Sequence, residues 1–505
     1  MPSIHASIHL GASAVSMLIL DYSNPDHPTP IEFLEQPLPL ARDIFSRGIV
    51  SRTTTERAAE ILSGYLDSLR ELGAGHDQIS RVVATNLLSE ASNLDVVLNR
   101  LSVATNLPVE VLDDGEMTRL IFLKTKRRLQ EIAPMKKKRT LITHVGPGNT
   151  RALLFVKGHI ESYASYRLGT HRTTEAIENS FSEGEAQLRL IQDNASGPIS
   201  RLEADLDNSQ VEELVLLGYE IQLLAPFLLQ PGETRCPVRT LAELCKEASR
   251  LPEDQRANAY HLDFHTAEAL LPALQINLSI AQALGLKHVH IPTSDFERGL
   301  LHDLPTSAEL TRDFETEVVR SATNLAAKYN THSGHGNHVA FLCKRLFEET
   351  RELHGMSDQD GLLLHVAAIL HECGGFVSPH AHHKHSQYLI LHSEIFGLSE
   401  AERTIVALVA RYHRQSPPKP SHEVYNTLDN NARLCICKLA AILRVADSLE
   451  RTHSSRVRDI KTSIRKTKLR LELKGISDAA AERLALESKG DLFRDIFGLE
   501  VIIRE

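Results

Sequence analysis

The sequence predicts an α/β half made of two lobes, followed by an all-helical domain and a small α+β subdomain. Segments typical of strands and of helices alternate through the first part of the chain, as expected for a sheet with helices on its faces. A strand–glycine–strand unit at 4–22 returns at 140–166, about 135 residues later, which predicts two similar lobes. From 308 to about 452 the apolar residues follow a helical period, and from 456 they alternate as in paired strands.

The composition is that of an ordinary globular protein. Of the 505 residues, 42% are hydrophobic and 24% are charged, and this length predicts about two to four domains. The net charge of −9 gives no overall attraction to nucleic acid or to acidic membranes, so neither is expected as a partner. The N-terminus shows no signal peptide, and no apolar run approaches the roughly 20 residues of a membrane span. The six cysteines form no CxxC pair, which is typical of free thiols in a reducing compartment, and we expect a cytoplasmic protein.

The first lobe is expected to cover residues 1–136. It begins with a β-hairpin whose turn is centred on Gly11. The elements expected after the hairpin are a helix at 53–73, a strand at 80–84, a helix near 89–105, a strand at 109–112 and a helix from near Asp114. The stretch 124–139 then holds eight lysines or arginines in sixteen positions. Such a run is typical of a solvated connector, and the alternative is a binding strip for a polyanion.

The remaining domains are expected at 137–305 for the second lobe, 306–452 for the helical domain and 453–505 for the small subdomain. After the second strand–glycine–strand unit, helices dominate 172–250, and 258–304 is expected to hold helices around a short strand, HVHI. The segment DLPTS at 303–307 marks the boundary to the helical domain. The small subdomain is expected to contain paired strands, a helix at 477–486 and a final strand, LEVIIRE.

The helical domain carries a histidine-rich stretch at 365–392. His371 and Glu372 close an apolar run, VAAIL, that is typical of a buried helix. Gly374 and Gly375 end that helix. Three more histidines follow within the reach of one loop: His382, His383 and His385.

Two further residues complete a set of possible metal ligands. His338 opens an amphipathic helix upstream, and Asp447 lies in another helix downstream. Imidazoles and carboxylates are ligands that divalent metals accept. The sequence therefore predicts a site for a divalent metal, Mg²⁺ or Mn²⁺, built from His338, His371, Glu372 and Asp447. Because 14 of the 26 histidines lie between 332 and 453, chance pairing of histidines and acids is the alternative.

A histidine, a His-acid pair and a distant aspartate, each on its own helix, resemble the HD phosphohydrolase superfamily. Glu372 stands where that superfamily usually has an aspartate. More widely, the order of parts over nearly the whole chain resembles the Ppx/GppA family of exopolyphosphatases and guanosine pentaphosphate phosphohydrolases. In the C-terminal half the segments that carry this resemblance are LLHVAAILHECGGFVSPHAHHKHSQYLI, ALVARYHRQSPPKPSH, LAAILRVADSLERTHSSRV and ESKGDLFRDIFG.

The resemblance implies an actin-like (ribonuclease H-like) N-terminal half of two lobes and an HD-like helical domain. It also implies release of phosphate from inorganic polyphosphate or guanosine pentaphosphate, and a homodimer. In the N-terminal half it implies Glu116 as the catalytic base. The phosphate-binding residues that it implies are Gly11, Gly146, Gly148, Asn149, Thr150 and Arg172. In the helical domain, His385 and His413 are expected to stabilise phosphate beside the metal.

The segments that carry the family's N-terminal chemistry are altered in this sequence. In VVATNLLSEASN the family's phosphate-binding arginine corresponds to Ser89. In VEVLDDGEMTRLIFL the catalytic glutamate aligns with Met117, and Glu116 lies one residue early. The aspartates of the two Asp-x-Gly loops are replaced by His9 and His144. Pro147 in the second loop removes a backbone donor that an anion cradle needs.

Three functions therefore stay open. The first, which we adopt as the family's activity, is release of phosphate from polyphosphate or guanosine pentaphosphate through the N-terminal cleft, impaired by these alterations. The second is a metal-dependent HD-type phosphohydrolase that acts through the helical half. The third is a non-catalytic regulator that binds polyphosphate or an alarmone. The histidines that replace the aspartates either cap turns or bind a softer metal or an anion.

Overall fold

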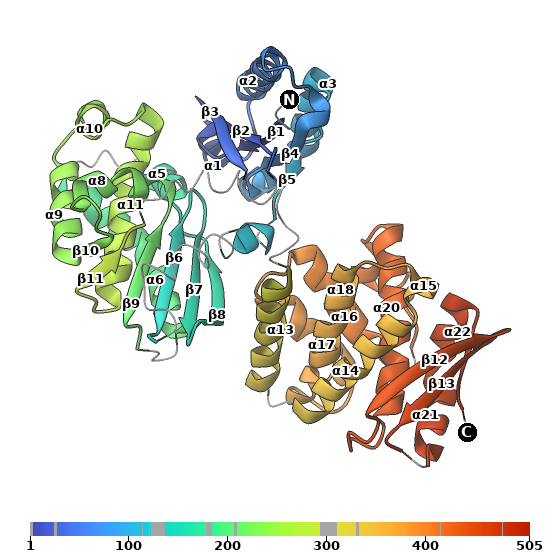
Figure 1. Ribbon diagram of the computed structural model, residues 1–505. Helices are drawn as coiled ribbons and strands as arrows, with labels where there is room; N and C mark the ends of the chain where they lie inside the picture. Colours follow the sequence, from blue (N-terminus) through green and yellow to red (C-terminus); the bar gives the residue numbers. More distant parts are fainter. Residues whose placement is uncertain are drawn as a thin grey trace. The chain divides into compact units, whose positions relative to one another are not determined.

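A computed structural model describes residues 4–24, 28–113, 115–120, 122, 137–177, 184–206, 210–292, 311–329, 333–414, 416–476 and 478–504 (Figure 1). The chain divides into two compact units, Met1–Thr311 and Arg312–Glu505. Most of the basic stretch at 124–139 lies outside the described residues. Its described end makes ion pairs within unit 1, from Lys138 to Glu213 and from Arg139 to Glu161.

The first lobe of unit 1 is built on a five-stranded sheet. Its strand order is β3 (Thr29–Pro37), β2 (Ala14–Asp21), β1 (Ile4–Leu10), β4 (Ile79–Ala84) and β5 (Glu110–Val111). Strands β1, β2 and β3 pair antiparallel, while β4 and β5 join in parallel. The helices are α1 (Leu40–Arg47), α2 (Arg52–Glu71) and α3 (Leu94–Thr105), and α2 and α3 pack side by side (Figure 1). Helix α2 begins where the Ser51 side chain accepts a hydrogen bond from the Thr54 amide.

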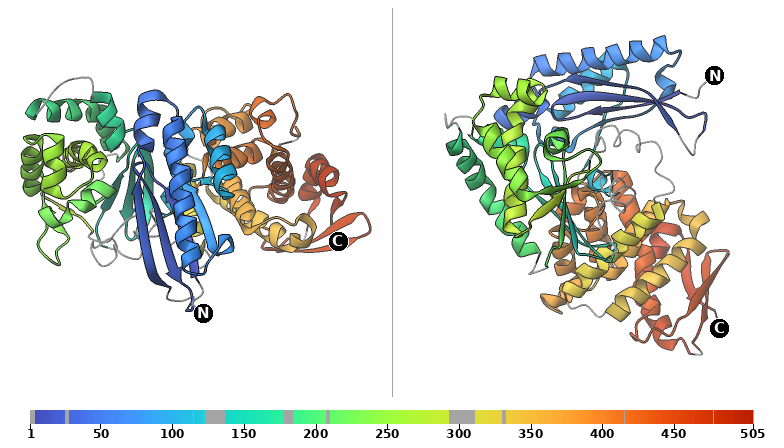
Figure 2. Two further views of the ribbon diagram at one scale, coloured as in Figure 1. Left: turned by 90° about the horizontal axis from the view of Figure 1, so that it is seen from above. Right: turned by 60° about the vertical axis from the view of Figure 1, so that its left-hand side comes forward.

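The second lobe has a six-stranded sheet with helices around it. The strand order is β10 (Arg235–Pro237), β11 (His288–His290), β9 (Glu213–Leu217), β6 (Thr140–Val145), β7 (Thr150–Val156) and β8 (His159–Tyr166). Every residue of β6 and β9 is buried, as expected for parallel central strands that are covered on both faces. The helices are α5 (Thr170–Ile177), α6 (Glu185–Asp205), α7 (Tyr219–Leu223), α8 (Ala225–Leu228), α9 (Val238–Ser249), α10 (Glu253–Tyr260) and α11 (Phe264–Ala283), and Figure 2 shows them in two further views.

The two lobes repeat one turn at the same place. The Gly11 amide donates to the Ala14 carbonyl at 2.8 Å after β1, and the Gly146 amide donates to the Asn149 carbonyl at 3.0 Å after β6. The expected duplication of the strand–glycine–strand unit is therefore confirmed.

Unit 2 begins as a bundle of helices. These are α13 (Thr311–Lys328), α14 (Ser333–Glu349), α15 (Arg351–His354), α16 (Asp358–Leu370), α17 (His382–Leu391), α18 (Glu400–Arg411), α19 (Glu423–Asn426) and α20 (Asn430–Leu449). Helix α16 begins with a capping box, in which the Ser357 hydroxyl and the Asp360 carboxylate bond to each other's backbone amides. The second half of α20 is buried on every side, so it lies at the centre of the bundle.

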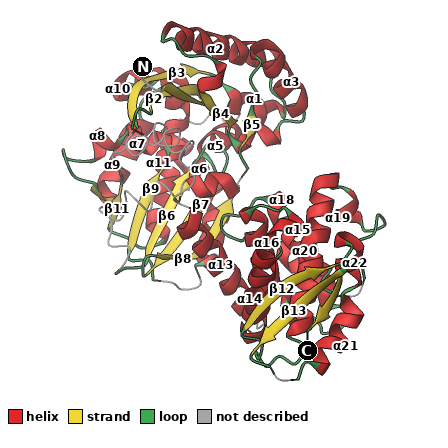
Figure 3. Ribbon diagram, turned by 45° about the vertical axis from the view of Figure 1, so that its right-hand side comes forward, coloured by secondary structure: helices red, strands yellow, loops and turns green. Residues whose placement is uncertain are grey.

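The end of the described chain forms a small sheet with two helices beside it (Figure 3). Strands β12 (Asp459–Arg465), β13 (Lys468–Lys474) and β14 (Glu500–Ile503) pair in that order, and the helices are α21 (Ala480–Lys489) and α22 (Asp491–Phe497). Arg444 of α20 is fully buried and bonds to Asp491 of α22 at 2.9 Å and to the Tyr412 carbonyl at 2.7 Å. This arginine therefore ties the small sheet's helices to the centre of the bundle.

Among the described helices, none combines the length and the apolar character that crossing a bilayer requires. All six cysteines are free thiols, and four of them are buried.

Candidate functional site

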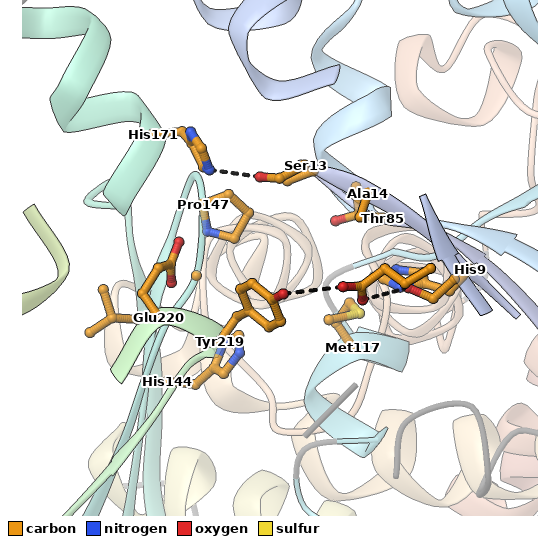
Figure 4. Close-up of a pocket in the computed structure, with 16 residues that line it drawn as sticks. His9, Ser13, Ala14, Thr85, Met117, His144, Pro147, His171, Tyr219 and Glu220 are labelled. Atoms are coloured by element: carbon orange, nitrogen blue, oxygen red, sulfur yellow. Dashed lines mark hydrogen bonds between the residues drawn. The ribbon is translucent and has the colours of Figure 1, made fainter. Parts of the chain in front are cut away.

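A cavity of about 100 Å³ lies beside the two glycine turns of unit 1 (Figure 4). His9, near the end of β1, and His144, near the end of β6, both line it and are 6% and 5% exposed. The two histidines that replace the family's aspartates are thus brought to one cavity. Its volume is enough for several water molecules or a small ligand.

The cavity wall is acidic and imidazole-rich. The titratable side chains among its described lining residues are His9, His144, His171, Glu35, Tyr219 and Glu220, and none of these described residues is a lysine or arginine. Glu220 is buried and accepts a hydrogen bond from the Thr170 hydroxyl at 2.9 Å. Burial raises the pKa of the Glu220 carboxyl to about 7. The sequence analysis did not single out this glutamate, although an acid within the apolar run LLGYEIQLL was the available signal.

Glu116 and Met117 lie on different sides of the helical segment 115–120. Met117 lines the cavity and is 6% exposed. Glu116 is not among the lining residues, and its Oε1 lies 2.9 Å from the Nη1 of Arg81. Successive helix residues point about 100° apart, so the two side chains face different directions, Met117 toward the cavity and Glu116 toward Arg81. The expected catalytic base therefore forms an ion pair, and a thioether occupies the cavity wall.

The expected phosphate-binding residues divide into two groups. Gly11 and Gly146 line the cavity, whereas Gly148, Asn149, Thr150 and Arg172 do not. The Thr150 hydroxyl donates to the Leu168 carbonyl at 2.7 Å. The Arg172 guanidinium donates to the Gly148 carbonyl at 2.9 Å and to Glu90 at 2.6 Å.

Side chains of the two lobes are joined at the cavity. Ser13 Oγ and His171 Nε2 are hydrogen-bonded at 2.8 Å. The Tyr219 hydroxyl donates to Glu35 Oε1 at 3.3 Å. Both contacts are drawn in Figure 4, and each links an element of the first lobe to one of the second.

A second candidate site lies in unit 2, where three buried side chains meet. His335 comes from the first turn of α14, His371 follows the end of α16, and Asp447 lies in the last turn of α20. One ligand atom of each lies within 4.8 Å of the others. The His335 Nε2 is 3.5 Å from Asp447 Oδ1, and the His371 Nε2 is 3.9 Å from the same oxygen.

Two residues extend this cluster toward solvent. Glu372 Oε2 lies 3.9 Å from His335 Nε2. Glu372, His453 and His335 form an overlapping group of possible ligands, and the His453 ring stacks on that of His335.

His338 does not join the cluster. Its Nε2 faces Glu450 Oε2 at 3.3 Å, and His335 takes the place that the sequence analysis gave to His338. His335 points into the bundle because it lies on the same face of α14 as the buried residues Val339, Leu342 and Leu346. The other three expected ligands, His371, Glu372 and Asp447, are brought together around His335.

The Asp447 carboxyl is held in its ionised form. Burial opposes ionisation of Asp447, but the His335 hydrogen bond and the charge of Lys489 outweigh it and hold the carboxyl pKa well below its usual range. The Lys489 ammonium contacts Asp447 directly. The Nδ1–H of His371 donates to the Ala368 carbonyl at 2.6 Å, which turns the Nε2 toward Asp447. That Nε2 is buried and makes no hydrogen bond to any described residue, so the donor set fits a divalent metal.

A cavity of about 510 Å³ opens beside the cluster. Its wall includes Glu372 and Asp447 together with three cationic side chains, Arg414, Arg451 and Lys489. His413 also lines this cavity, and its Nε2 lies 3.2 Å from the Nε2 of His382. His385 is half-buried and is not among the lining residues, so His382 is the histidine beside His413; both His382 and His385 lie on α17, not in the loop that the sequence analysis expected.

The fold of unit 1 places the protein among the actin-like two-lobed proteins, here followed by a helical unit with a histidine–carboxylate cluster. The chain belongs to the Ppx/GppA phosphatase family. The family's profile matches residues 21–307, and the profile of Ppx/GppA phosphatase domain III matches residues 319–490. The resemblance found in the sequence is therefore confirmed.

The similar proteins are distant in sequence and similar in length. A guanosine-5'-triphosphate,3'-diphosphate pyrophosphatase of Vibrio vulnificus is 21% identical over 451 residues, which cover 87% of this chain and 86% of that one. The protein of the same name from Vibrio cholerae is 22% identical over 452 residues, with the same coverage. The structure of an exopolyphosphatase from Cytophaga hutchinsonii matches 61% of this chain and 99% of its own, with a TM-score of 0.51 and 18% identity. At that identity the structural match shows the fold.

Proposed function

We propose that the protein is a divalent-metal-dependent phosphohydrolase that releases phosphate from guanosine pentaphosphate or inorganic polyphosphate. Family membership supports the reaction class, and the names of the similar proteins supply the substrates. The observation that carries the proposal is the buried cluster of His335, His371 and Asp447 beside a cavity with cationic walls.

In this proposal the chemistry belongs to unit 2. A divalent ion, Mg²⁺ or Mn²⁺, would be held by His335, His371 and Asp447, with Glu372 beside them. When bound, such an ion supplies Lewis acidity toward a phosphoryl oxygen. Phosphoryl transfer depends mainly on positioning and charge neutralisation, so the chain's own task is to orient the anionic group.

The cationic residues of the larger cavity suit that task. Arg414, Arg451 and Lys489 line it together, and their N–H groups form charge-assisted hydrogen bonds to phosphate oxygens. His413 is 3% exposed, and its Nδ1–H donates to the Ala410 carbonyl at 2.6 Å. This bond orients the Nε2 toward His382 and the cavity, and burial holds the pKa of His413 well below its usual range, so that its neutral imidazole accepts a hydrogen bond there.

The cleft of unit 1 is the second candidate for the same reaction. Its two glycine turns support this candidate, since they keep the family's framework. Three features count against it: Met117 at the position of the base, the two histidines at the positions of the aspartates, and the lack of a lysine or arginine among the described residues of its wall. A non-catalytic regulator that binds polyphosphate or an alarmone is the third candidate, and it explains the same alterations.

We also propose that the chain has four domains, at 1–136, 137–305, 306–452 and 453–505. We further propose that the protein forms a homodimer, and size-exclusion chromatography with light scattering tests this.

The decisive experiment is phosphate release by the purified protein from guanosine pentaphosphate and long-chain polyphosphate, with Mg²⁺, Mn²⁺ or a chelator. We expect metal-dependent release that His371→Ala lowers by at least about 100-fold and that Glu116→Ala leaves within about twofold. Loss only in Glu116→Ala would return the reaction to the cleft of unit 1. Binding of either compound without release would establish the regulator.

A further inference from the structure

The cavity of unit 1 has the wrong charge for a phosphate site. Phosphate recognition in proteins relies on arginine and lysine side chains and on backbone amides. Among the described residues of the cavity wall there is no arginine or lysine, and two of them, Glu35 and Glu220, carry carboxyls. Pro147 also removes an amide from the second glycine turn.

Glu220 is held in this cavity by a close approach of the backbone. Gly218, two residues earlier, has a φ of +146°, and a Cβ there would lie 2.5 Å from the Val145 carbonyl oxygen. The chain passes close to the end of β6 just before α7 begins, and only glycine fits at this point because any side chain would clash with the Val145 carbonyl. The Glu220 side chain thereby reaches the cavity that His144 and Gly146 line from β6.

The Glu220 carboxyl has little to balance a negative charge. Its Oε1 accepts the Thr170 hydroxyl, the carboxyl also accepts a hydrogen bond from its own backbone amide, and no described lysine or arginine acts on its pKa. His9, His144, His171, Tyr219 and Glu35 share the cavity, and Asp263 adds a negative charge nearby. A buried carboxylate without a cationic partner is costly, and a bound cation removes much of that cost.

We propose that the cavity of unit 1 binds a small organic cation with N–H donors, an alkylammonium or a guanidinium, through the carboxylate of Glu220. The ligand's N–H groups donate to Glu220, and its carbon atoms pack on Met117 and Val145. A volume of about 100 Å³ limits it to a few non-hydrogen atoms. This site is independent of the reaction proposed for unit 2, because none of its residues belongs to that unit.

The binding is coupled to a proton. The carboxyl of Glu220 has a pKa raised to about 7 by burial, and the cation favours the deprotonated form. As the pH rises toward 7, the apparent dissociation constant should therefore fall about tenfold per pH unit. Above pH 7 it should level off. For a ligand of three non-hydrogen atoms the dissociation constant is expected to be no tighter than about 1 mM.

The test uses ligand-observed NMR and thermal shift on the full chain. The probes are ethylammonium and methylguanidinium at about 1 to 20 mM, with tetramethylammonium as a cation that has no N–H donor and orthophosphate as an anion. We expect saturable binding of ethylammonium, methylguanidinium or both, and the comparison of the two shows whether the site prefers an alkylammonium or a guanidinium. We expect no binding of tetramethylammonium or orthophosphate. Glu220→Gln should weaken the binding at pH 8 by at least about tenfold and abolish its pH dependence.

Two matched controls keep the result interpretable. Glu243→Gln removes an exposed carboxylate that pairs with Arg239 on α9, and it should leave the binding unchanged. The melting temperature of Glu220→Gln shows that the variant is folded, because glutamine keeps the shape and accepts the Thr170 hydrogen bond. Cation binding that Glu220→Gln leaves intact, or orthophosphate binding in place of cation binding, would overturn the proposal.

Discussion

The Nε2 of His335 lies 3.5 Å from Oδ1 of Asp447, so the first turn of α14 is joined to the last turn of α20. His338, on the next turn of α14, faces Glu450 instead, at 3.3 Å. The two histidines thus form a natural pair of test and control positions.

We expect His335→Ala to weaken Mn²⁺ binding by at least about tenfold, because it removes a buried imidazole that belongs to both groups of possible ligands. His338→Ala should change the affinity by less than about threefold. Electron paramagnetic resonance of free Mn²⁺ measures both constants directly. The reverse order of the two effects would show that His338 is the ligand.

Restoring the family's residues in unit 1 should bring back a second activity. In a His371→Ala background, we expect the combination His9→Asp, His144→Asp and Met117→Glu to produce Mg²⁺-dependent phosphate release. The physical reason is that carboxylates at these positions supply the hard oxygen ligands and the base that the present cavity lacks. A phosphate-release assay with His371→Ala alone gives the baseline, and no gain over it would mean that more than these three positions has changed.

The Glu220 carboxyl should make the stability of unit 1 depend on pH. Its folded-state pKa of about 7 lies above the ordinary value of 4.5, so the folded state holds the proton more tightly and loses stability as the pH rises from 4.5 to about 7, with no further loss above that. The loss is expected to reach about 3 kcal/mol above pH 7, since each pKa unit corresponds to about 1.4 kcal/mol.

Urea unfolding of the protein and of Glu220→Gln at pH 5, 6, 7 and 8 measures this effect. Glu220→Gln should gain stability relative to the unmodified protein as the pH rises. The free energy of unfolding of Glu243→Gln should change with pH in the same way as that of the unmodified protein. Parallel curves for all three proteins would rule out a raised pKa at Glu220.

Two neighbouring glycines should respond very differently to alanine. A Cβ on Gly374 would lie 2.1 Å from the His382 carbonyl oxygen and 2.3 Å from the Ser386 amide nitrogen, whereas nothing lies within 4 Å of one on Gly375. We expect Gly374→Ala to destabilise unit 2 by about 2 to 4 kcal/mol and to displace α17, while Gly375→Ala costs less than about 1 kcal/mol. Thermal unfolding compares them, and equal effects would contradict the close contact of Gly374 with α17.

Much of the architecture could be predicted because it depends on local patterns. The glycine turns, the alternation of strands and helices and the buried run before His371 are all encoded within short segments. Strand β3 (Thr29–Pro37) was missed because most of its residues are exposed, and an edge strand shows little apolar alternation.

The candidate sites depend on contacts between distant segments, and here prediction was less complete. His371, Glu372 and Asp447 lie around His335, which the sequence analysis did not name; His338, which it named, faces Glu450 because of the rotation of α14 about its axis. The contact of Arg172 with Glu90 crosses between the lobes and has no local sequence signal.

The tie between Arg444 and Asp491 has a consequence for the order in which unit 2 forms during synthesis. Asp491 lies 47 residues after its partner Arg444, and Lys489 lies 42 residues after its partner Asp447. When α20 leaves the ribosome, both of its buried ionised groups still await their partners, and a buried charge without a partner is strongly unfavourable. The helical bundle is therefore expected to close only after α21 and α22 have emerged from the ribosome, later than unit 1.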